Sequence, residues 1–345
     1  MSNPFRYLIR LDPLGLLYGS SGRFLSAENL VGKAGEHFPP DSPTAAGLIA
    51  SSRSRSELRE LYTAGPFLHH QELLLKAPLN LLQSRETDPE GWRQVTTRLI
   101  WQGGDDETDT GGWQPAGGEA PPSKPQQGGW IPLSAWAKQA APGSRVRSDP
   151  WKSVPHLHPR LRSDERVSAQ EDALFLELAI ALDPDVSLAY LSSHPVTDGR
   201  YRFGGEGHLV DLRCEALPDA LVDLLAQPLR ASFALITPGL WGSSRLSQRE
   251  PLITGPGAGI HPWHHQGQAP AILTDRPQPW RHRLGAGADG KPRLSRGRWA
   301  VPAGSCYHVA PGHVLPPWPD WDERWFPREG LSFRHFGTGL ALPLP

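Results

Sequence analysis

Several short segments of the chain alternate between apolar and polar residues, which is the pattern of a β-strand with one face in water. Every second side chain from Phe5 to Leu11 is apolar or aromatic, and Arg6 and Arg10 lie between them. This period of two predicts a strand. Similar or continuously apolar segments predict further strands at residues 67–75, 95–101, 187–191, 209–212, 231–237, 305–309 and 339–342. Residues 173–182 fit either a buried strand or a helix, and we favour a strand.

Helices are predicted at fewer places. Ser42 suits the N-cap of a helix and Pro43 its first position, so we expect a helix over residues 44–61. Shorter helices are expected at residues 131–140 and 219–226. The order strand–helix–strand–strand–helix–strand thus occurs once before residue 183, and a looser version of it follows.

That order is typical of a ferredoxin-like (split βαβ) domain, and 345 residues are enough for about two domains. We therefore expect an α+β fold with two ferredoxin-like (RRM-like) domains, residues 1–183 and 184–345. The 36 glycines and 37 prolines shorten regular elements and predict long Gly/Pro-rich loop insertions between them.

Residues 102–129 differ from the rest of the chain because they are rich in Gly, Pro and acidic residues and contain almost no aliphatic side chain. Such a segment buries too little apolar surface to offset the entropy of ordering it. We expect an inserted surface loop that is disordered unless a partner holds it, although Trp113 does not fit this pattern. The thirteen tryptophans are expected mainly as anchors in the core or in loops.

Composition and charge exclude several classes of protein. The net charge of −1 and the pI of about 6.9 do not fit a free-standing polycation that coats nucleic acid. Two cysteines, Cys214 and Cys306, do not make a disulfide framework and suit a reducing compartment such as the cytoplasm. The first residues lack a signal-peptide pattern, and no run of about 18 apolar residues predicts a membrane span.

The sequence carries no signature of a catalytic or metal site. The P-loop, HExxH and GxSxG motifs are absent from it. The densest group of histidines, His261, His264 and His265, has Pro262 inside it and glycine-rich flanks. Because no regular element would fix these rings, we interpret them as ordinary loop histidines and expect no metal and no cofactor.

A basic segment is more informative. Between residues 275 and 298 only Asp275 and Asp289 are acidic, and Trp280 and His282 lie among the cations. Such a loop can neutralise phosphates and stack on a base, or it can be a solvated loop balanced by acids elsewhere. Its cations are Arg276, Arg281, Arg283, Lys291, Arg293, Arg296 and Arg298.

Two glycine clusters, at residues 203–208 and 336–339, let the backbone approach a ligand closely or simply form turns. Neither matches the dinucleotide fingerprint GxGxxG between a strand and a helix. The aromatic RNP signature of a typical RRM is also missing. RNA bound here would therefore contact backbone loops and arginines more than a sheet of stacked rings.

Taken in order, a set of short motifs resembles one family. They are LDPL at 11–14, GRF at 22–24, FPPDSPTAAG at 38–47, GPFL at 65–68, APLNL at 77–81, GEG at 205–207, LITP at 235–238, VPAGSCY at 301–307 and FGTG at 336–339. Their order and spacing resemble subunit three of the Cmr complex, the type III-B CRISPR effector, in the RAMP superfamily. The resemblance covers most of the chain except the 102–129 insert.

The resemblance implies two ferredoxin-like domains, no active site and a role as an RNA-binding subunit in antiviral defence. Such a subunit caps the 5′ handle of the CRISPR RNA (crRNA). It lies between the large polymerase-like subunit and the backbone RAMP subunits, and it meets target RNA only indirectly and no membrane.

With the basic and glycine-rich loops, the resemblance gives a set of candidate RNA-binding residues. They are Tyr18, Arg23, Lys33, Gly204, Gly205, Glu206, Gly207, His208, Arg281, Arg283, Lys291, Arg293, Arg296, Arg298, Gly337, Thr338 and Gly339. Two positions depart from the family pattern. The turn at residues 18–23 keeps only Arg23 of an Arg-Asp-Gly-Arg-type turn, and His208 stands where an arginine is common.

Three other interpretations stay open at this point. The chain could be a RAMP endoribonuclease that processes precursor crRNA with a histidine as general acid or base. It could be the equivalent subunit of a type III-D complex, which shares these motifs. A Trp-rich carbohydrate-binding module is disfavoured by the basic loop and by the missing secretion signal.

Overall fold

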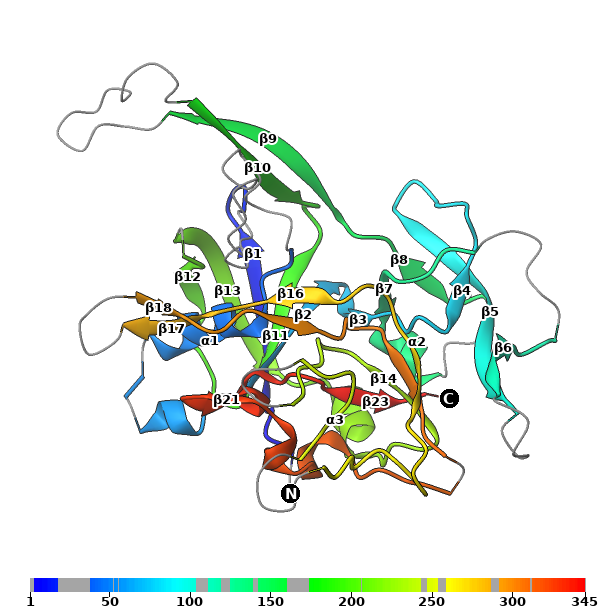
Figure 1. Ribbon diagram of the computed structural model, residues 1–345. Coiled ribbons are helices and arrows are strands. Elements are labelled where there is room, and N and C mark those ends of the chain that lie inside the picture. The colour runs from blue at the N-terminus through cyan, green and yellow to red at the C-terminus, as the bar shows by residue number, and fades with distance from the viewer. Residues whose placement is uncertain are drawn as a thin grey trace.

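The fold is built mainly from β-strands, and few helices accompany them (Figure 1). The computed structural model describes residues 3–17, 38–51, 53–54, 56–103, 111–118, 125–138, 142–159, 174–205, 207–242, 247–253, 259–286, 292–310 and 312–344. Among these residues, no helix is both long and apolar enough to cross a membrane.

The larger sheet is organised around the first strand of the chain. Strand β1 (Tyr7–Pro13) lies between β13 (His208–Ala216) and β11 (Ser187–Ser192), and β11 in turn pairs with β2 (Thr63–His70). All these pairings are antiparallel. The alternation that predicted β1 has its physical basis here, because Leu11 is buried in the sheet while Arg10 reaches Glu215 on β13 at 2.9 Å.

The sheet extends on both sides of these four strands. Its further members are β12 (Gly199–Phe203) next to β13 and, beyond β2, β3 (Glu72–Lys76), β7 (Trp130–Pro132), β8 (Arg145–Arg147), β5 (Trp92–Gln102) and β4 (Leu81–Gln83), with β6 (Gly112–Pro115) paired to β5.

Helix α1 (Ser42–Ala50) joins β1 to β2 and is much shorter than the 44–61 predicted from sequence. The prediction was wrong beyond residue 50 because a serine-rich segment follows. Ser51 lies at the C-cap, and its hydroxyl donates to the Leu48 carbonyl at 2.7 Å. Serine side chains compete for backbone groups in this way and favour helix ends over helix interiors.

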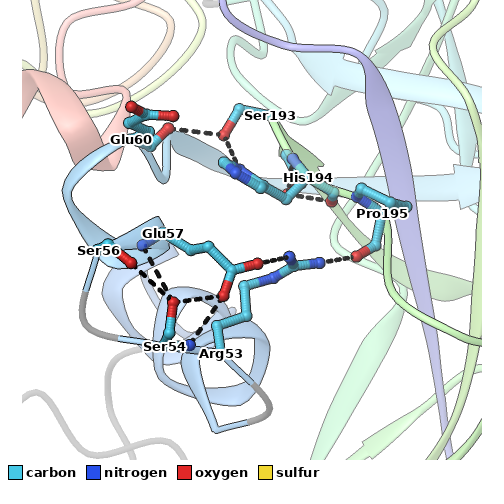
Figure 2. A network of polar contacts seen from close by, with 9 residues as sticks. Arg53, Ser54, Ser56, Glu57, Glu60, Ser193, His194 and Pro195 are labelled. Atoms are coloured by element: carbon cyan, nitrogen blue, oxygen red, sulfur yellow. Dashed lines mark hydrogen bonds and ion pairs between the residues drawn. The ribbon is translucent and has the colours of Figure 1, made fainter.

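The 3₁₀ turn η2 (Glu57–Arg59) follows, and a serine before it binds its first residue. The backbone N–H and the hydroxyl of Ser54 donate to one carboxylate oxygen of Glu57 at 2.9 and 2.6 Å (Figure 2). Arg53 holds the other carboxylate oxygen at 3.2 Å and also donates to the Pro195 carbonyl. Through Arg53 the end of α1 is tied to the turn that follows β11.

The smaller sheet has four strands in the order β15 (Ala271–Leu273), β20 (Cys306–His308), β14 (Ser232–Leu235) and β23 (Ala341–Pro343). Helix α3 (Asp219–Ala226), predicted at these residues, precedes β14.

Short hairpins and turns complete the structure, and the longest hairpin, β9–β10, projects from the body in Figure 1. These elements are α2 (Leu133–Ala137), the pairs β9 (Trp151–Pro159) with β10 (Leu174–Leu182), β16 (Gln278–Trp280) with β19 (Arg298–Ala300), β17 (Arg283–Ala286) with β18 (Pro292–Leu294) and β21 (Arg328–Glu329) with β22 (Leu331–Ser332), and the 3₁₀ turns η3 (Trp318–Asp320), η4 (Glu323–Trp325) and η5 (Phe333–Phe336).

Buried aromatic rings form the centre of the second half, as the tryptophan content suggested. Trp263 is fully buried and contacts Tyr307 at 4.9 Å and Trp241 at 5.2 Å between ring centroids. Phe5, from the start of the chain, stacks on Trp318 at 5.7 Å. The N-terminal and C-terminal parts of the chain therefore share a hydrophobic core.

The expected α+β architecture appears in part. The order β13-β1-β11-β2 with α1 between β1 and β2 is half of a split βαβ pattern. In the described residues, however, the strand β12 and no helix lies between β11 and β13, and no α-helix follows α3. Two ferredoxin-like domains are not confirmed, and the division at residue 183 stays a prediction because the larger sheet takes strands from both sides of it.

Two local expectations need correction. The strand predicted at 67–75 is a hairpin, β2 and β3, because Gln71 adopts a left-handed conformation with φ of 60°. Part of the 102–129 insert is ordered, since β6 pairs with β5 and places Trp113 edge-on to Trp101 at 6.0 Å.

Candidate RNA-binding surface

The glycine cluster predicted as a ligand-binding loop forms the turn between β12 and β13. The N–H of Gly207 donates to the carbonyl of Gly204 at 3.2 Å, and the φ angles of these residues are +67° and +74°. Such left-handed conformations favour glycine, which has no Cβ. The turn therefore presents bare backbone at one end of the larger sheet.

An arginine from the basic segment lies directly against this turn. A Cβ on Gly205 would be 3.1 Å from Nη2 and 3.2 Å from Cζ of Arg283, so a larger residue at this position would push the guanidinium group away by a few tenths of an ångström. Arg202 also lies against the turn, since a Cβ on Gly207 would be 3.4 Å from its Nη1. Two guanidinium groups thus lie close to one glycine turn, although their residues come from separate parts of the sequence.

The basic segment is a long hairpin with a break in the middle. β16–β19 form its base and β17–β18 its outer part (Figure 1). Between the two parts, the N–H of His282 donates to the Ser295 hydroxyl at 2.9 Å, and the Ser295 N–H donates to the His282 carbonyl at 2.8 Å. The hairpin therefore carries Arg283 outward from a fixed base.

That base is anchored in a small aromatic cluster. The ring of His282 contacts Trp280 at 4.9 Å, Phe336 at 5.0 Å and Phe333 at 5.5 Å between centroids. Burial among these rings lowers the pKa of His282 to about 4. His282 is thus an uncharged core residue at neutral pH and adds no charge to the basic segment.

The predicted arginines of the hairpin fall into two groups. Arg283, Arg293 and Arg296 are exposed, and Arg281 is half-buried with its Nε donating to the Ser295 carbonyl at 2.7 Å. Arg298 is buried instead. It forms an ion pair with Glu329 and lies over the Phe333 ring at 4.7 Å. Arg298 therefore stabilises the hairpin base and does not face solvent.

The second glycine cluster lies inside the protein. Gly337 ends η5 in a left-handed conformation and accepts a hydrogen bond from the Thr237 hydroxyl at 2.6 Å. Thr338 is buried and donates to the Phe333 carbonyl at 3.1 Å. Gly339 packs on the indole of Trp241. These contacts give residues 337–339 a packing role, and we leave them out of the proposed RNA surface.

The remaining predicted residues are placed as follows. His208 pairs with Phe203 where β12 meets β13 and is half-buried. Tyr18, Arg23, Lys33, Glu206 and Lys291 lie outside the described residues.

Sequence reasoning missed Arg202. The segment GRYRF at residues 199–203 carried a signal for it, because exposed arginines alternate there with the aromatic residues Tyr201 and Phe203. The neighbouring Arg200 pairs with Asp211 at 3.3 Å. Among the described residues no carboxylate is paired with Arg202, and its side chain is exposed beside the turn.

Comparison with protein families decides the family of the chain. A family model described as a CRISPR-associated protein (Cas_Cmr3) matches residues 32–344. The chain belongs to this family. The resemblance seen in the ordered sequence motifs, to subunit three of the Cmr complex, is thereby confirmed. No curated protein matches the chain.

Solved structures similar to this Cas_Cmr3-family chain come from CRISPR effector complexes. One is a chain of the "Type III-B Cmr-beta bound to cognate target RNA", with 12% identity over 88% of this chain and 86% of that chain and a TM-score of 0.46. Another is a chain of the "Csm3-Csm4 subcomplex in the type III-A CRISPR-Cas interference complex", with 10% identity over 90% and 99% of the two chains and a TM-score of 0.36.

Proposed function

We propose that this chain is a non-catalytic RNA-binding subunit of a type III-B CRISPR effector. In that role it caps the 5′ handle of crRNA and joins the large polymerase-like subunit to the backbone RAMP subunits. Membership of the Cas_Cmr3 family supports the assignment to an effector. The contact of Arg283 with the Gly204–Gly207 turn is the observation that carries the RNA-binding role.

The chemistry of this contact suits a phosphate backbone. Guanidinium groups form charge-assisted, bidentate hydrogen bonds with phosphate oxygens. A glycine turn lets a nucleotide approach the backbone closely, and single-stranded RNA held in a fixed shape is recognised by such mixed contacts. The guanidinium groups of Arg202 and Arg283 therefore form a two-cation binding site for phosphate at the edge of the larger sheet.

The overall charge indicates how strongly the isolated chain binds. With a net charge of −1, it lacks the general excess of cations that holds RNA without partners. A subunit inside a ribonucleoprotein shares its RNA with neighbouring subunits. We expect weak, salt-sensitive binding by the isolated chain and higher stability once partners are bound.

The test is a pull-down of the tagged chain from its native host, with sequencing of the bound RNA and mass spectrometry of the bound proteins. We expect short RNAs with one shared repeat-derived 5′ segment, together with other type III subunits. Recovery without RNA or Cas proteins would overturn the assignment.

Variants locate the RNA contact within that complex. Arg202→Ala with Arg283→Ala should lower the yield of RNAs with an intact 5′ segment while the protein partners remain bound. The matched control is Arg230→Ala, which removes an exposed arginine outside the proposed surface. Because the control removes one charge and the double variant two, a loss of RNA in the control half as large as in the double variant would show that total charge matters and not this turn.

A further inference from the structure

Glu250, His261 and His264 form a compact side-chain cluster beside the smaller sheet. Oε1 of Glu250 lies 2.7 Å from Nε2 of His264 and 3.4 Å from Nδ1 of His261. One ligand atom from each of the three residues lies within 4.8 Å of the other two. The two imidazole rings stack with centroids 4.3 Å apart. All three side chains are half-buried.

A buried tryptophan fixes the two histidines. Trp263, between them in sequence, is fully buried and packs on Trp241 and Tyr307. Around it the chain turns, and the N–H of His264 donates to the His261 carbonyl at 3.0 Å. Both imidazoles therefore project from a turn whose central residue is anchored in the core.

Hydrogen bonds also fix the segment that carries Glu250. The N–H of Ile253 donates to the Ile260 carbonyl at 2.9 Å, and the buried Tyr307 donates its hydroxyl to the Arg249 carbonyl. These bonds hold the residue next to Glu250 and bring its segment beside the His261 turn. The sequence suggested ordinary loop histidines because no helix or strand was expected here. A tryptophan anchor and a β-bridge supply the frame instead.

Two polar atoms of the cluster lack hydrogen bonds. Oε2 of Glu250 and Nδ1 of His261 are buried and have no hydrogen-bond partner among the described residues. An unsatisfied buried polar atom costs free energy. A cation held between the three side chains would give both atoms a partner.

We propose that Glu250, His261 and His264 bind one divalent transition-metal ion of the zinc class. Two imidazole nitrogens and one carboxylate oxygen are a known zinc ligand set, with water in the fourth position. Tetrahedral ligands at about 2.1 Å from an ion stand about 3.4 Å apart. The Oε1–Nδ1 distance between Glu250 and His261 already has this value, and the 2.7 Å distance between Glu250 and His264 lengthens when the ion enters. The stacked rings tilt apart on binding so that both lone pairs point at the ion.

Metal binding is measured on the tag-free full-length chain after dialysis against EDTA. Zinc chloride is titrated in competition with a chromophoric chelator, and Co²⁺ absorption is recorded separately. We expect one zinc ion per chain and the intense visible bands of four-coordinate Co²⁺. Absence of a wild-type site, or a Co²⁺ spectrum like that of the aqueous ion, overturns the proposal.

Variants then assign the ligands. Glu250→Gln and His264→Asn should each weaken zinc binding about 100-fold or more, since loss of even an outer-shell partner costs 10–100-fold. The matched control is His265→Ala, which removes the adjacent histidine outside the cluster and should keep the site. Circular dichroism checks that each variant is folded. Unchanged affinity in both folded ligand variants would place the zinc elsewhere and contradict the proposal.

Discussion

Gly339 lies so close to Trp241 that no larger residue fits between the end of the chain and the aromatic core. A Cβ on Gly339 would be 2.1 Å from Cη2 of the indole, and the φ of Gly339 is +66°. We predict that Gly339→Ala lowers the free energy of unfolding by about 3 kcal/mol, through steric overlap and backbone strain. Urea denaturation measures the change.

The control for this substitution is Gly330→Ala. Gly330 has a similar φ of +79°, but a Cβ there would meet no atom within 4 Å. Only backbone strain remains, and we expect a loss of about 1 kcal/mol. Equal losses in the two variants would show that the contact with Trp241 contributes nothing.

A second prediction separates two arginines of the basic segment. Arg298 and Glu329 form a buried ion pair, with side chains only 3% and 13% exposed, whereas Arg296 is exposed. Glu329→Gln leaves a buried charge without its partner and should cost about 3 kcal/mol of stability. Arg296→Ala should change stability by less than about 0.5 kcal/mol. Thermal and urea unfolding distinguish the two outcomes, and a large effect of Arg296→Ala would contradict the division.

The buried His282 predicts a pH dependence of stability. Its pKa is about 4 in the folded protein, against 6.5 in the unfolded chain. Between these values the unfolded chain binds the proton and the folded protein does not, so stability falls as the pH is lowered from 6.5 toward 4. At about 1.4 kcal/mol per pKa unit, this residue accounts for a loss of about 2 kcal/mol by pH 4.5. Urea denaturation at pH 7 and pH 4.5 measures it.

The matched variant is His282→Gln, which does not titrate. Burial also lowers the pKa values of His69 and His308, and these groups contribute equally to both proteins. The stability of the variant should therefore decrease less on acidification. Parallel pH curves for the two proteins would show that His282 is not the titrating group.

The proposed RNA surface predicts a change in salt dependence. Each phosphate neutralised on single-stranded RNA adds ~0.7 to the slope of log K against log salt. Replacing both Arg202 and Arg283 by alanine should reduce the slope by about 1.4. Fluorescence anisotropy with a short single-stranded RNA measures the slope when the salt concentration is varied, for example from about 50 to about 200 mM. An unchanged slope would show that neither arginine contacts a phosphate. Arg230→Ala serves as the control.

Local sequence patterns predicted most of the secondary structure. The strand at β11 and helix α3 agree with the residues expected, because alternating or amphipathic apolar positions are decided within a few residues. The end of α1 was missed because serine capping competes with a helical pattern. The hairpin turn at Gln71 carries neither Gly nor Pro, so no ordinary turn signal marked it.

For the candidate site, the sequence predicted some of the residues but not how they come together. Charge and glycine content identified Arg283 and Gly205, but their contact depends on two hairpins meeting in space. The same counting of charges included Arg298, which has its partner Glu329 far along the chain. Sequence shows which residue types are present, and long-range packing decides which of them reach solvent.

The central position of β1 in the larger sheet has a consequence for synthesis of the protein. Both neighbours of β1, strands β11 and β13, come from residues 187–216. At 5–20 residues per second, a ribosome needs roughly 10–40 s to produce them after β1 has emerged. During that time both edges of the first strand are open to pairing with other chains. A message truncated before residue 187 would therefore yield a fragment prone to aggregation, while the complete chain closes both edges itself.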